Sequence, residues 1–423
     1  MIDIISIDDK KRIDKIKNRR AADLDKVISR VKPAIEQVKT FGDRAIIKFT
    51  KLYDGYDVTK NTIRISEREI KEAYKKVDNN VVKALKLAAA NINDYAKAQM
   101  PKEWTKEFSK GVVAGQIIRP LSRVGCYVPA GQYPLPSTVL MTVIPAKVAG
   151  VREIIVCSPP RPKNYEILVA ADIAGADKIF RIGGAQAIAA MAYGTDIVPK
   201  VEKIVGPGNV YVTAAKKLVY GDSGIDFLAG PSEVMIYSEK GNASLIAADM
   251  LAQAEHDRLA SAIFITVNDK LAKEVKKELI KQADELSTKD IAKDSLKNYG
   301  AIIVADSVSD AFGLINDFAP EHLEIENESQ LKYVMNAGAV FIGENSCESA
   351  GDYAVGPSHV LPTLGSARFT AGLSVYDFVK MISIQKLSKD GLESLKSTVV
   401  DIARAEGLEA HARAVERRFE DGA

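Results

Sequence analysis

The chain has 423 residues, 47% hydrophobic and 27% charged, which is ordinary for a globular protein and excludes disorder of the whole chain. Its 58 basic and 56 acidic residues give a formal net charge of +2. Because positive and negative charges are almost equal in number, the sequence does not predict the basic stripe that a nucleic-acid-binding protein presents. We therefore expect no nucleic-acid partner.

Cysteine usage and the start of the chain bear on its compartment. Cys126, Cys157 and Cys347 are odd in number and far apart, which is typical of a reducing compartment. The start, MIDIISIDDKK, has acids where a signal peptide has a basic segment and a long apolar core. The most apolar stretch, STVLMTVIPAKVAG, is interrupted by Pro145 and Lys147 and is too short for a membrane span. We therefore expect a soluble, cytoplasmic protein that does not bind membranes.

Residues from about 20 to 100 are expected to be helical, because apolar residues recur there at spacings of three and four. Ser66 and Glu69 have the spacing of a capping box, which predicts a helix start. Pro101 and Trp104 lie in a break after the last of these helices.

From about residue 112 the pattern changes to strands that alternate with helices, which indicates parallel sheets covered by helices on both faces. A last stretch from about 376 is expected to be helical and to end exposed. The expected strands after the first turn-rich stretch, VVAGQIIRPLSRVGCYVPAG, are EIIVCS, KIFRIG, KIVGPG, SAIFITVN, AIIVADS and AVFIG. The fold class is therefore α/β, with two α/β regions and helical ends.

Three glycine-rich corners are expected at the carboxyl ends of strands, where such sheets bind ligands. They are residues 183–184, 206–209 and the segment AGPSE at 229–233. The segment VGPGNVYVT predicts a strand, a tight turn and a helix start, whose free N–H groups suit an anion. It is not a G-x-G-x-x-G motif, since Tyr211 replaces the third glycine, so a structural turn fits it as well as a nucleotide site does.

The four histidines of the chain all lie beside groups that can bind a metal or move a proton. In AQAEHD, Gln253 and His256 are three residues apart and would share one helix face. Glu321 and His322 directly follow Pro320, which disfavours helix at the residue before it. An adjacent Glu–His pair of this kind could supply two proton-transfer groups, although such pairs also occur on ordinary surfaces.

The other two histidines lie near the C-terminus. Asp352 and His359 belong to the stretch SAGDYAVGPSHVLPT, which its Gly and Pro residues predict to be an ordered loop or turn. Glu406 and His411 lie in a segment that fits an exposed helix, broken at Gly407. Imidazole is a common ligand of transition metals, and Zn²⁺ accepts N and O ligands. The chain has no C-x₂-C, H-E-x-x-H or EF-hand motif, so a metal site would have to be assembled from distant segments.

Six of these segments, taken in order, closely resemble those of histidinol dehydrogenases, which are zinc- and NAD-dependent enzymes of histidine biosynthesis. The segments are GPGNVYVTAAKKLV, AGPSEV, AQAEHD, NDFAPEHLE, SAGDYAVGPSHVLPT and EGLEAHA, and the similarity runs from about residue 120 to 415. The resemblance implies oxidation of L-histidinol to L-histidine in two steps through L-histidinal, a four-electron reaction that uses two NAD⁺.

The resemblance also implies roles for individual residues. Glu321 and His322 would be the proton-transfer pair: His322 as general base on the substrate hydroxyl, and Glu321 as activator of the water that hydrates the aldehyde. One Zn²⁺ per subunit would orient the substrate by holding its imidazole and amino groups. The implied zinc ligands are Gln253, His256, Asp352 and His411. The implied substrate contacts are Ser232, Gln253, His256, His322, Asp352, His359, Glu406 and His411, and the implied NAD contacts are Tyr127, Gln186 and Asn209.

The family fold implied by the resemblance has two incomplete Rossmann-like parallel-sheet domains and helical terminal segments. It would be a homodimer in which the last segment, with Glu406 and His411, completes the site of the partner. The implied parts are an N-terminal segment, 1–22; a first domain with the zinc and catalytic residues, 23–126 with 231–372; a second domain on the NAD side, 127–230; and a C-terminal segment, 373–423.

The sequence departs from the family pattern at two places. Cys347 stands in NSCESAGDY where a proline is usual, and Pro357-Ser358 replaces a Thr-Asn pair before His359. Both departures concern the loops that orient Asp352 and His359. Two other interpretations are a zinc hydrolase with Glu321 as general base and a catalytically inactive binding protein. The hydrolase would need neither NAD nor the GPGN and GGAQ corners, and the intact pair with all four ligand candidates argues against the inactive protein.

Overall fold

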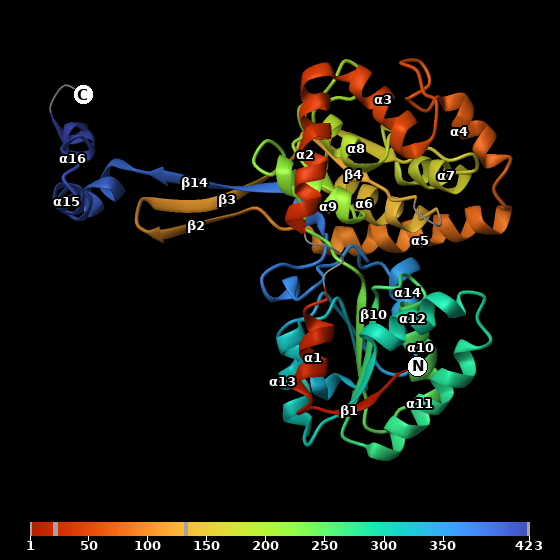
Figure 1. Ribbon diagram of the computed structural model, residues 1–423. Coiled ribbons are helices and arrows are strands. Elements are labelled where there is room, and N and C mark those ends of the chain that lie inside the picture. The colour runs from red at the N-terminus through yellow and green to blue at the C-terminus, as the bar shows by residue number, and fades with distance from the viewer. Residues whose placement is uncertain (1, 20–23, 131–133, 421–423) are drawn as a thin grey trace. The chain divides into compact units, whose positions relative to one another are not determined.

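The computed structural model describes residues 2–19, 24–130 and 134–420, and its strands form three sheets (Figure 1). The chain divides into two compact units, Met1–Gln99 with Leu121–Phe378 and Met100–Pro120 with Val379–Ala423. The first unit carries two parallel sheets and the second a small antiparallel sheet. Within the described ranges, none of the helices has the length and apolar character needed to cross a membrane.

The larger sheet is parallel throughout and has the strand order β1-β11-β10-β9-β12-β13. If the strands are numbered along the chain with β9 as the first, their order across the sheet from β11 to β13 is third, second, first, fourth, fifth. The order in which strands are added therefore reverses between β9 and β12. Sheets of this type commonly bind ligands at such a switch point, outside the carboxyl ends of the strands. The strands are β1 (Ile4–Ser6), β9 (Glu233–Tyr237), β10 (Ser261–Thr266), β11 (Ala301–Val304), β12 (His322–Ile325) and β13 (Ala339–Ile342).

Helices cover both faces of this sheet, as the sequence predicts (Figure 1). Because successive strand residues point to opposite faces, Phe264 packs against one helical layer and Ile263 against the other. One layer consists of α10 (Ala243–Ala254), α11 (Asp269–Ala283) and α12 (Lys289–Tyr299), and the other of α1 (Lys10–Lys17) and α13 (Val308–Phe318). The N-terminal segment, expected to be helical, therefore contributes α1 but also the edge strand β1.

The second sheet repeats the same strand order, β6-β5-β4-β7-β8, and is also parallel. Its strands are β4 (Arg123–Tyr127), β5 (Glu153–Ser158), β6 (Lys178–Arg181), β7 (Lys203–Val205) and β8 (Gly224–Ile225). Three helices that pack together, α5 (Asn79–Gln99), α6 (Pro136–Val148) and α7 (Tyr165–Ala174), belong to this part, and α6 contacts β4 and β5. The alternation predicted between residues 136 and 219 is thus confirmed.

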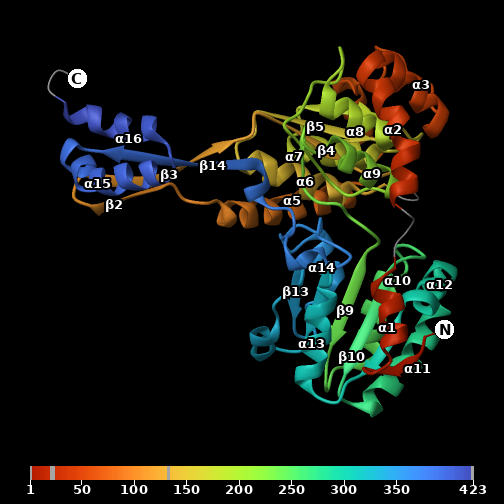
Figure 2. The same ribbon diagram turned by 60° about the vertical axis from the view of Figure 1, so that its left-hand side comes forward.

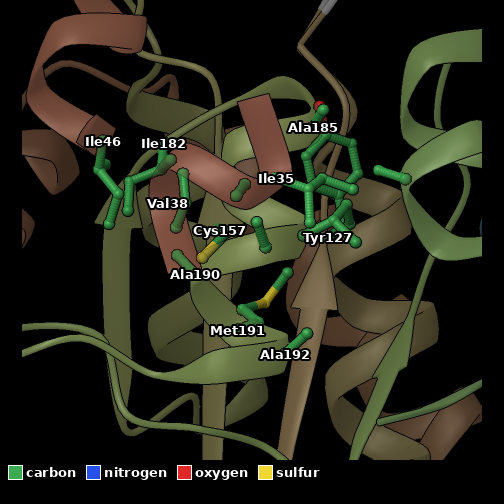
Figure 3. Packing of buried hydrophobic residues seen from close by; sticks show 14 of the residues in the cluster. Ile35, Val38, Ile46, Tyr127, Cys157, Ile182, Ala185, Ala190, Met191 and Ala192 are labelled. Carbon is green, nitrogen blue, oxygen red and sulfur yellow. The ribbon is translucent and has the colours of Figure 1, made fainter. Parts of the chain in front are cut away.

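The N-terminal helices share a core with this second sheet (Figure 3). Val38 and Ile46 pack in one buried cluster with Cys157 and Met191. The helices of this cluster are α2 (Leu24–Phe41), α3 (Asp43–Asp54), α8 (Gly184–Tyr193) and α9 (Val210–Val219). Helix α4 (Glu67–Tyr74), outside the cluster, begins at the predicted capping box. Because the N-terminal helices share this core, the structure does not favour the predicted domain division, which joins 23–126 to 231–372. That division stays a prediction. Its boundary at 22/23 lies outside the described residues.

The second unit is an antiparallel sheet with two helices beside it (Figure 2). The expectation of helix from about 376 is wrong for β14 (Val379–Leu387), because this segment pairs along its whole length with β3. The remaining elements are β2 (Trp104–Ser109), β3 (Val112–Pro120), α15 (Lys389–Ala405) and α16 (Glu409–Glu416). Gly407, with φ +78°, breaks the helix between α15 and α16 as predicted.

Candidate active site

The predicted proton-transfer pair, Glu321 and His322, lies where β9 and β12 begin side by side. His322 is the first residue of β12 and pairs with Val234 of β9. Before it, α13 ends at Phe318, and Ala319, with φ +51°, and Pro320 redirect the chain into the strand. The predicted helix break at Pro320 is confirmed. The AGPSE corner precedes β9, so its expected position at a carboxyl strand end is wrong: it lies at the amino end.

His322 is buried among carboxylates. Its Nδ1 lies 3.3 Å from the carbonyl oxygen of Glu233 and 3.6 Å from Oε1 of Glu348. Its Nε2 lies 3.4 Å from Oδ1 of Asp352, but the alignment is poor and this nitrogen has no hydrogen-bond partner among the described residues. Burial lowers the pKa of His322, but Glu348, Glu321 and Asp352 outweigh it and raise that pKa to about 10.

Glu321 is equally buried and is held from one side. Its Oε2 accepts a hydrogen bond of 2.9 Å from the backbone N–H of Glu233. Burial raises the pKa of Glu321 to about 8, against the opposing effects of His322 and of that hydrogen bond. A carboxyl group with a pKa near neutrality can take up and release a proton under physiological conditions, as a general acid or base must.

Three side chains beside this pair could hold a metal ion. One ligand atom from each of His256, Glu348 and Asp352 lies within 4.8 Å of the others. Two of the three, His256 and Asp352, are ligands that the resemblance implies. Burial raises the pKa of Glu348 well above its ordinary range. Burial opposes ionisation of Asp352 too, but the neighbouring His322 outweighs it and lowers the pKa of that carboxyl.

Gln253 and His256 do not share a helix face, which corrects the prediction. Helix α10 ends at Ala254, so the buried Gln253 lies in its last turn and the exposed His256 lies beyond it. A turn links the two, with the N–H of His256 3.3 Å from the carbonyl oxygen of Gln253. In the orientation that its neighbours favour, the Gln253 amide donates to both carboxylate oxygens of Glu348, at 2.5 and 3.3 Å.

Asp352 and His359 are brought together, although not both in a loop. Asp352 lies in the short helix α14 (Glu348–Tyr353), and Cys347, at the departure from the family pattern, is its N-cap. Nδ1 of His359 lies 2.7 Å from the carbonyl oxygen of Asp352, and its Nε2 lies 3.2 Å from Oγ1 of Thr138 in α6. Burial lowers the pKa of His359, which favours a neutral ring with the proton on Nδ1, because a carbonyl can only accept.

Sequence reasoning missed Glu348, although it stands one helical turn before Asp352, a spacing that puts both on one helix face. It also missed a second buried acid, Glu324, whose Oε1 accepts from the N–H of Glu348 at 3.0 Å. Burial and the neighbouring Asp249 raise the pKa of Glu324 to about 8. The predicted substrate contact Ser232 is half-buried and immediately precedes β9.

The predicted NAD contacts follow strands of the other sheet. Tyr127 ends β4, and its hydroxyl accepts from the N–H of Gly184 at 3.1 Å. Gln186 lies in the first turn of α8, and its Nε2 donates to Oδ2 of Asp54 at 3.1 Å. Burial raises the pKa of Asp54 to about 6. Tyr127 lies at the carboxyl end of its strand, and Gln186 follows the corner at residues 183–184 that is expected there.

Asn209 confirms the predicted strand, turn and helix start. It is the N-cap of α9, and its Oδ1 accepts from the N–H groups of Tyr211 and Val212 at 3.1 and 3.2 Å. The remaining predicted residues belong to the second unit: Glu406 is the C-cap of α15, His411 lies in α16, and both are exposed.

A protein-family model described as histidinol dehydrogenase matches residues 17–419. The chain belongs to the histidinol dehydrogenase family. The family resemblance seen in the sequence is thereby confirmed. It identifies the chain as an NAD-dependent oxidoreductase of histidine biosynthesis and does not favour the hydrolase interpretation.

Individual members of the family agree over nearly the whole chain. A histidinol dehydrogenase from Methanothermobacter thermautotrophicus is 46% identical over 98% of this chain and 98% of its own length. One from Caldanaerobacter subterraneus subsp. tengcongensis is 48% identical over 96% and 95%. The crystal structure of histidinol dehydrogenase from Elizabethkingia anophelis matches with a TM-score of 0.92 at 37% identity, covering 98% of this chain and 97% of that one. The predicted α/β fold class with two Rossmann-like sheets is confirmed.

Proposed function

We propose that the chain oxidises L-histidinol through L-histidinal to L-histidine with two NAD⁺ per turnover, and that Glu321 and His322 serve as its proton-transfer groups. The observation that carries this assignment is the burial of both side chains at the amino ends of the neighbouring strands β9 and β12, each beside the backbone of Glu233. A buried acid and a buried imidazole that differ in pKa can take different proton-transfer steps.

In the first step, His322 takes the hydroxyl proton of histidinol while a hydride leaves the carbinol carbon for NAD⁺. Glu321 then takes a proton from the water that adds to the aldehyde carbon, while His322 returns its proton to the former carbonyl oxygen. His322 is then free to take a hydroxyl proton of the hydrate as the second hydride leaves for the second NAD⁺. With Nδ1 turned to the carbonyl of Glu233, Nε2 of His322 is the nitrogen that can face the substrate, and it has no hydrogen-bond partner within the described part of the chain.

The donor set beside His322 fits a zinc ion. His256 and Asp352 offer an imidazole and a carboxylate whose ligand atoms lie, with one of Glu348, within 4.8 Å of one another. The buried Gln253 would add an amide oxygen, and with the partner subunit's His411 these groups would hold one Zn²⁺ per subunit. The bound ion would supply orientation by holding the imidazole and amino groups of histidinol. The carboxylates keep the pKa of His322 high, and this pKa would fall once a cation at Asp352 compensated their charge.

Other implied substrate contacts have positions that suit the role. Ser232 precedes β9 beside the pair, and His359 is fixed between the backbone of Asp352 and Thr138. Glu406 would contact substrate in the partner's site. Tyr127, Gln186 and Asn209 would bind NAD⁺, since all three stand at or just after carboxyl ends of strands in one sheet.

A homodimer with shared sites is part of the proposal, and it is supported by the second unit's surface. Large apolar side chains are exposed there, which a partner subunit would cover; they include Trp104, Phe108, Met381 and Ile402. We further propose that the enzyme works in the cytoplasm, in keeping with its three unpaired cysteines.

The test is the yield of NADH from histidinol and NAD⁺, measured together with the zinc content of the purified protein. We expect two NADH for each histidinol consumed and about one zinc per chain. A zinc-loaded protein that produces no NADH from histidinol would refute the proposed function, and a yield of one NADH would refute the second oxidation step.

A further inference from the structure

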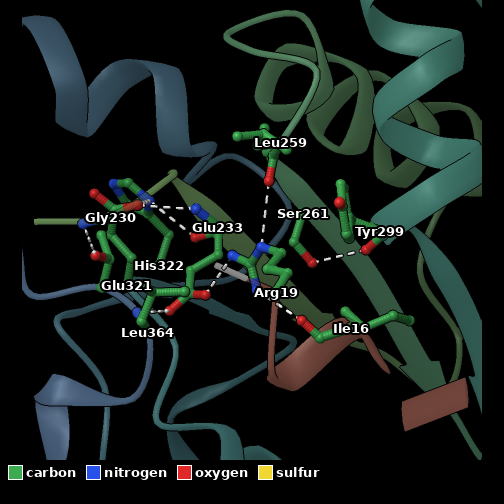
Figure 4. A network of polar contacts seen from close by, with 12 residues as sticks. Ile16, Arg19, Gly230, Glu233, Leu259, Ser261, Tyr299, Glu321, His322 and Leu364 are labelled. Atoms are coloured by element: carbon green, nitrogen blue, oxygen red, sulfur yellow. Dashed lines mark hydrogen bonds and ion pairs between the residues drawn. The ribbon is translucent and has the colours of Figure 1, made fainter. Parts of the chain in front are cut away.

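Glu233, the first residue of β9, touches both proton-transfer residues through its backbone (Figure 4). Its N–H donates to Oε2 of Glu321 at 2.9 Å, and its carbonyl oxygen lies 3.3 Å from Nδ1 of His322. The orientation of this one residue therefore sets which carboxylate oxygen of Glu321 is occupied and which imidazole nitrogen of His322 is left for substrate.

The side chain of Glu233 is itself fixed by a buried ion pair. Its Oε2 lies 2.5 Å from Nη2 of Arg19, and both side chains are almost fully buried, at 6% and 2% exposure. Arg19 reaches this place from the segment that follows α1, and its other donors bond to the carbonyl oxygens of Ile16 and Leu259, both at 3.3 Å (Figure 4). The guanidinium is thus held on three sides, so that it presents one rigid donor to Glu233.

The second carboxylate oxygen of Glu233 holds another loop. Oε1 accepts from the N–H of Leu364 at 3.1 Å, and Leu364 has the left-handed φ of +53°, which is uncommon for a residue other than glycine. The neighbouring Thr363 accepts from the N–H of Gly230 at 2.6 Å. Both sides of the Glu233 carboxylate are therefore anchored, and its backbone has little freedom to turn.

The sheet alone does not require this arrangement. The ladder between β9 and β10 begins at Glu233, and its backbone pairing would form with any side chain. A buried ion pair, by contrast, loses much of its attraction to desolvation and is weak evidence for a stabilising role. The pair therefore needs another explanation, and its position behind both proton-transfer groups supplies one.

We propose that Arg19 and Glu233 are positioning residues for both oxidation steps: their ion pair fixes the Glu233 backbone that orients Glu321 and His322. This inference rests on the proposed function of that pair. Because one residue holds both groups, loosening it affects the alcohol and the aldehyde steps alike, whereas a change at Glu321 itself bears mainly on hydration of the aldehyde. Neither Arg19 nor Glu233 needs to touch substrate, zinc or NAD⁺ for this effect.

The experiment compares Arg19→Met, Glu233→Gln and the double variant with wild type. We expect kcat to fall roughly 10- to 100-fold in each, with similar losses for histidinol and for supplied histidinal in single turnovers, since small misplacements of reacting groups have effects of this size. KM for NAD⁺ and zinc content should stay near their wild-type values. Lys178→Met removes a less buried ion pair of 2.5 Å with Glu153 in the other sheet; as the control for loss of an ion pair away from the site, it should keep full kcat.

The double variant separates positioning from stability. Either single change leaves a buried charge without its partner, and the double variant removes both charges, so thermal stability should recover in part while kcat stays low. Arg19→Lys, which keeps the charge but not the planar donor set, should fold and show an intermediate kcat.

Three outcomes would overturn the inference: kcat within about threefold of wild type in the double variant, kcat that recovers together with stability, or loss of zinc along with activity. If the wild-type protein yields no NADH from histidinol, the proposed function fails instead, so the two failures are distinguishable.

Discussion

Lys216→Met tests a buried ion pair beneath the GPGN corner. Lys216 of α9 pairs with Asp226, and their side chains are only 3% and 1% exposed. The pair holds both backbone polar groups of one residue: Nζ of Lys216 donates to the carbonyl oxygen of Gly206 at 3.0 Å, and the N–H of Gly206 donates to Asp226 at 2.8 Å. Gly206 has φ +112°, and a Cβ there would stand 2.1 Å from the carbonyl oxygen of Tyr127, so no side chain fits at this position.

The methionine fills much of the same volume but leaves the Asp226 carboxylate buried without its partner. Breaking a buried pair in this way costs about 3–5 kcal/mol, and little of that is relieved by solvent, because neither group is accessible. Adding Asp226→Asn removes the stranded charge and keeps an acceptor for Gly206, so about half of the loss or more should be recovered.

The readout is amide hydrogen exchange in β7 and α9, converted to a free energy of opening. Fluorescence would follow the wrong region, since the single tryptophan, Trp104, lies in β2 of the second unit. A loss below about 1 kcal/mol for Lys216→Met, or a double variant as unstable as the single one, would refute the reasoning from buried charge. Because Gly206 leads to Asn209, we also expect KM for NAD⁺ to rise in both variants.

Four further predictions concern the site. His322→Asn should lower kcat by roughly 100-fold or more while zinc content and histidinol binding persist, and loss of zinc with activity would contradict the assigned role. His256→Ala and Asp352→Ala should each weaken zinc binding sharply without unfolding the protein, as metal analysis and chelator titration would show. Refolding His411→Asn together with His322→Asn should restore roughly a quarter of wild-type activity, since half of the dimers are mixed and each has one intact site; no recovery in verified mixed dimers would exclude a shared site. Burial raises the pKa of Asp54 to about 6, so ionisation of this carboxyl group destabilises the folded state as the pH rises from about 4 through 6. Asp54→Asn should therefore have a higher thermal stability than wild type at pH 8 but not at pH 4.

Local sequence patterns are sufficient to predict features that depend only on residues close together in the chain. The capping box at Ser66, the helix end at Pro320 and the turn at Asn209 each depend on residues a few positions apart, and all three are confirmed. The sequence predicts helix where the structure has strand β14, because this strand is fixed by pairing with β3, more than 250 positions earlier in the sequence. No spacing rule connects such distant segments.

The site shows the same limit. The sequence predicts the site residues that belong to short motifs, but it does not predict which other residues surround them. Glu348 is missed, and His256 lies beyond the helix that the sequence predicts for it. The contact between Arg19 and Glu233 joins residues 214 positions apart and could not be read from the chain. What the sequence lacked was chiefly information about burial, which turns ordinary acids such as Glu321 into groups with raised pKa.

The common strand order of the two parallel sheets has an electrostatic consequence. At the carboxyl ends of strands in the second sheet, α8 and α9 begin, and the positive ends of their dipoles favour a pyrophosphate. At the amino ends in the first sheet, α10 finishes just after Gln253, and the negative end of its dipole favours a metal cation. The same architecture therefore suits ligands of opposite charge, according to which edge of the sheet is used.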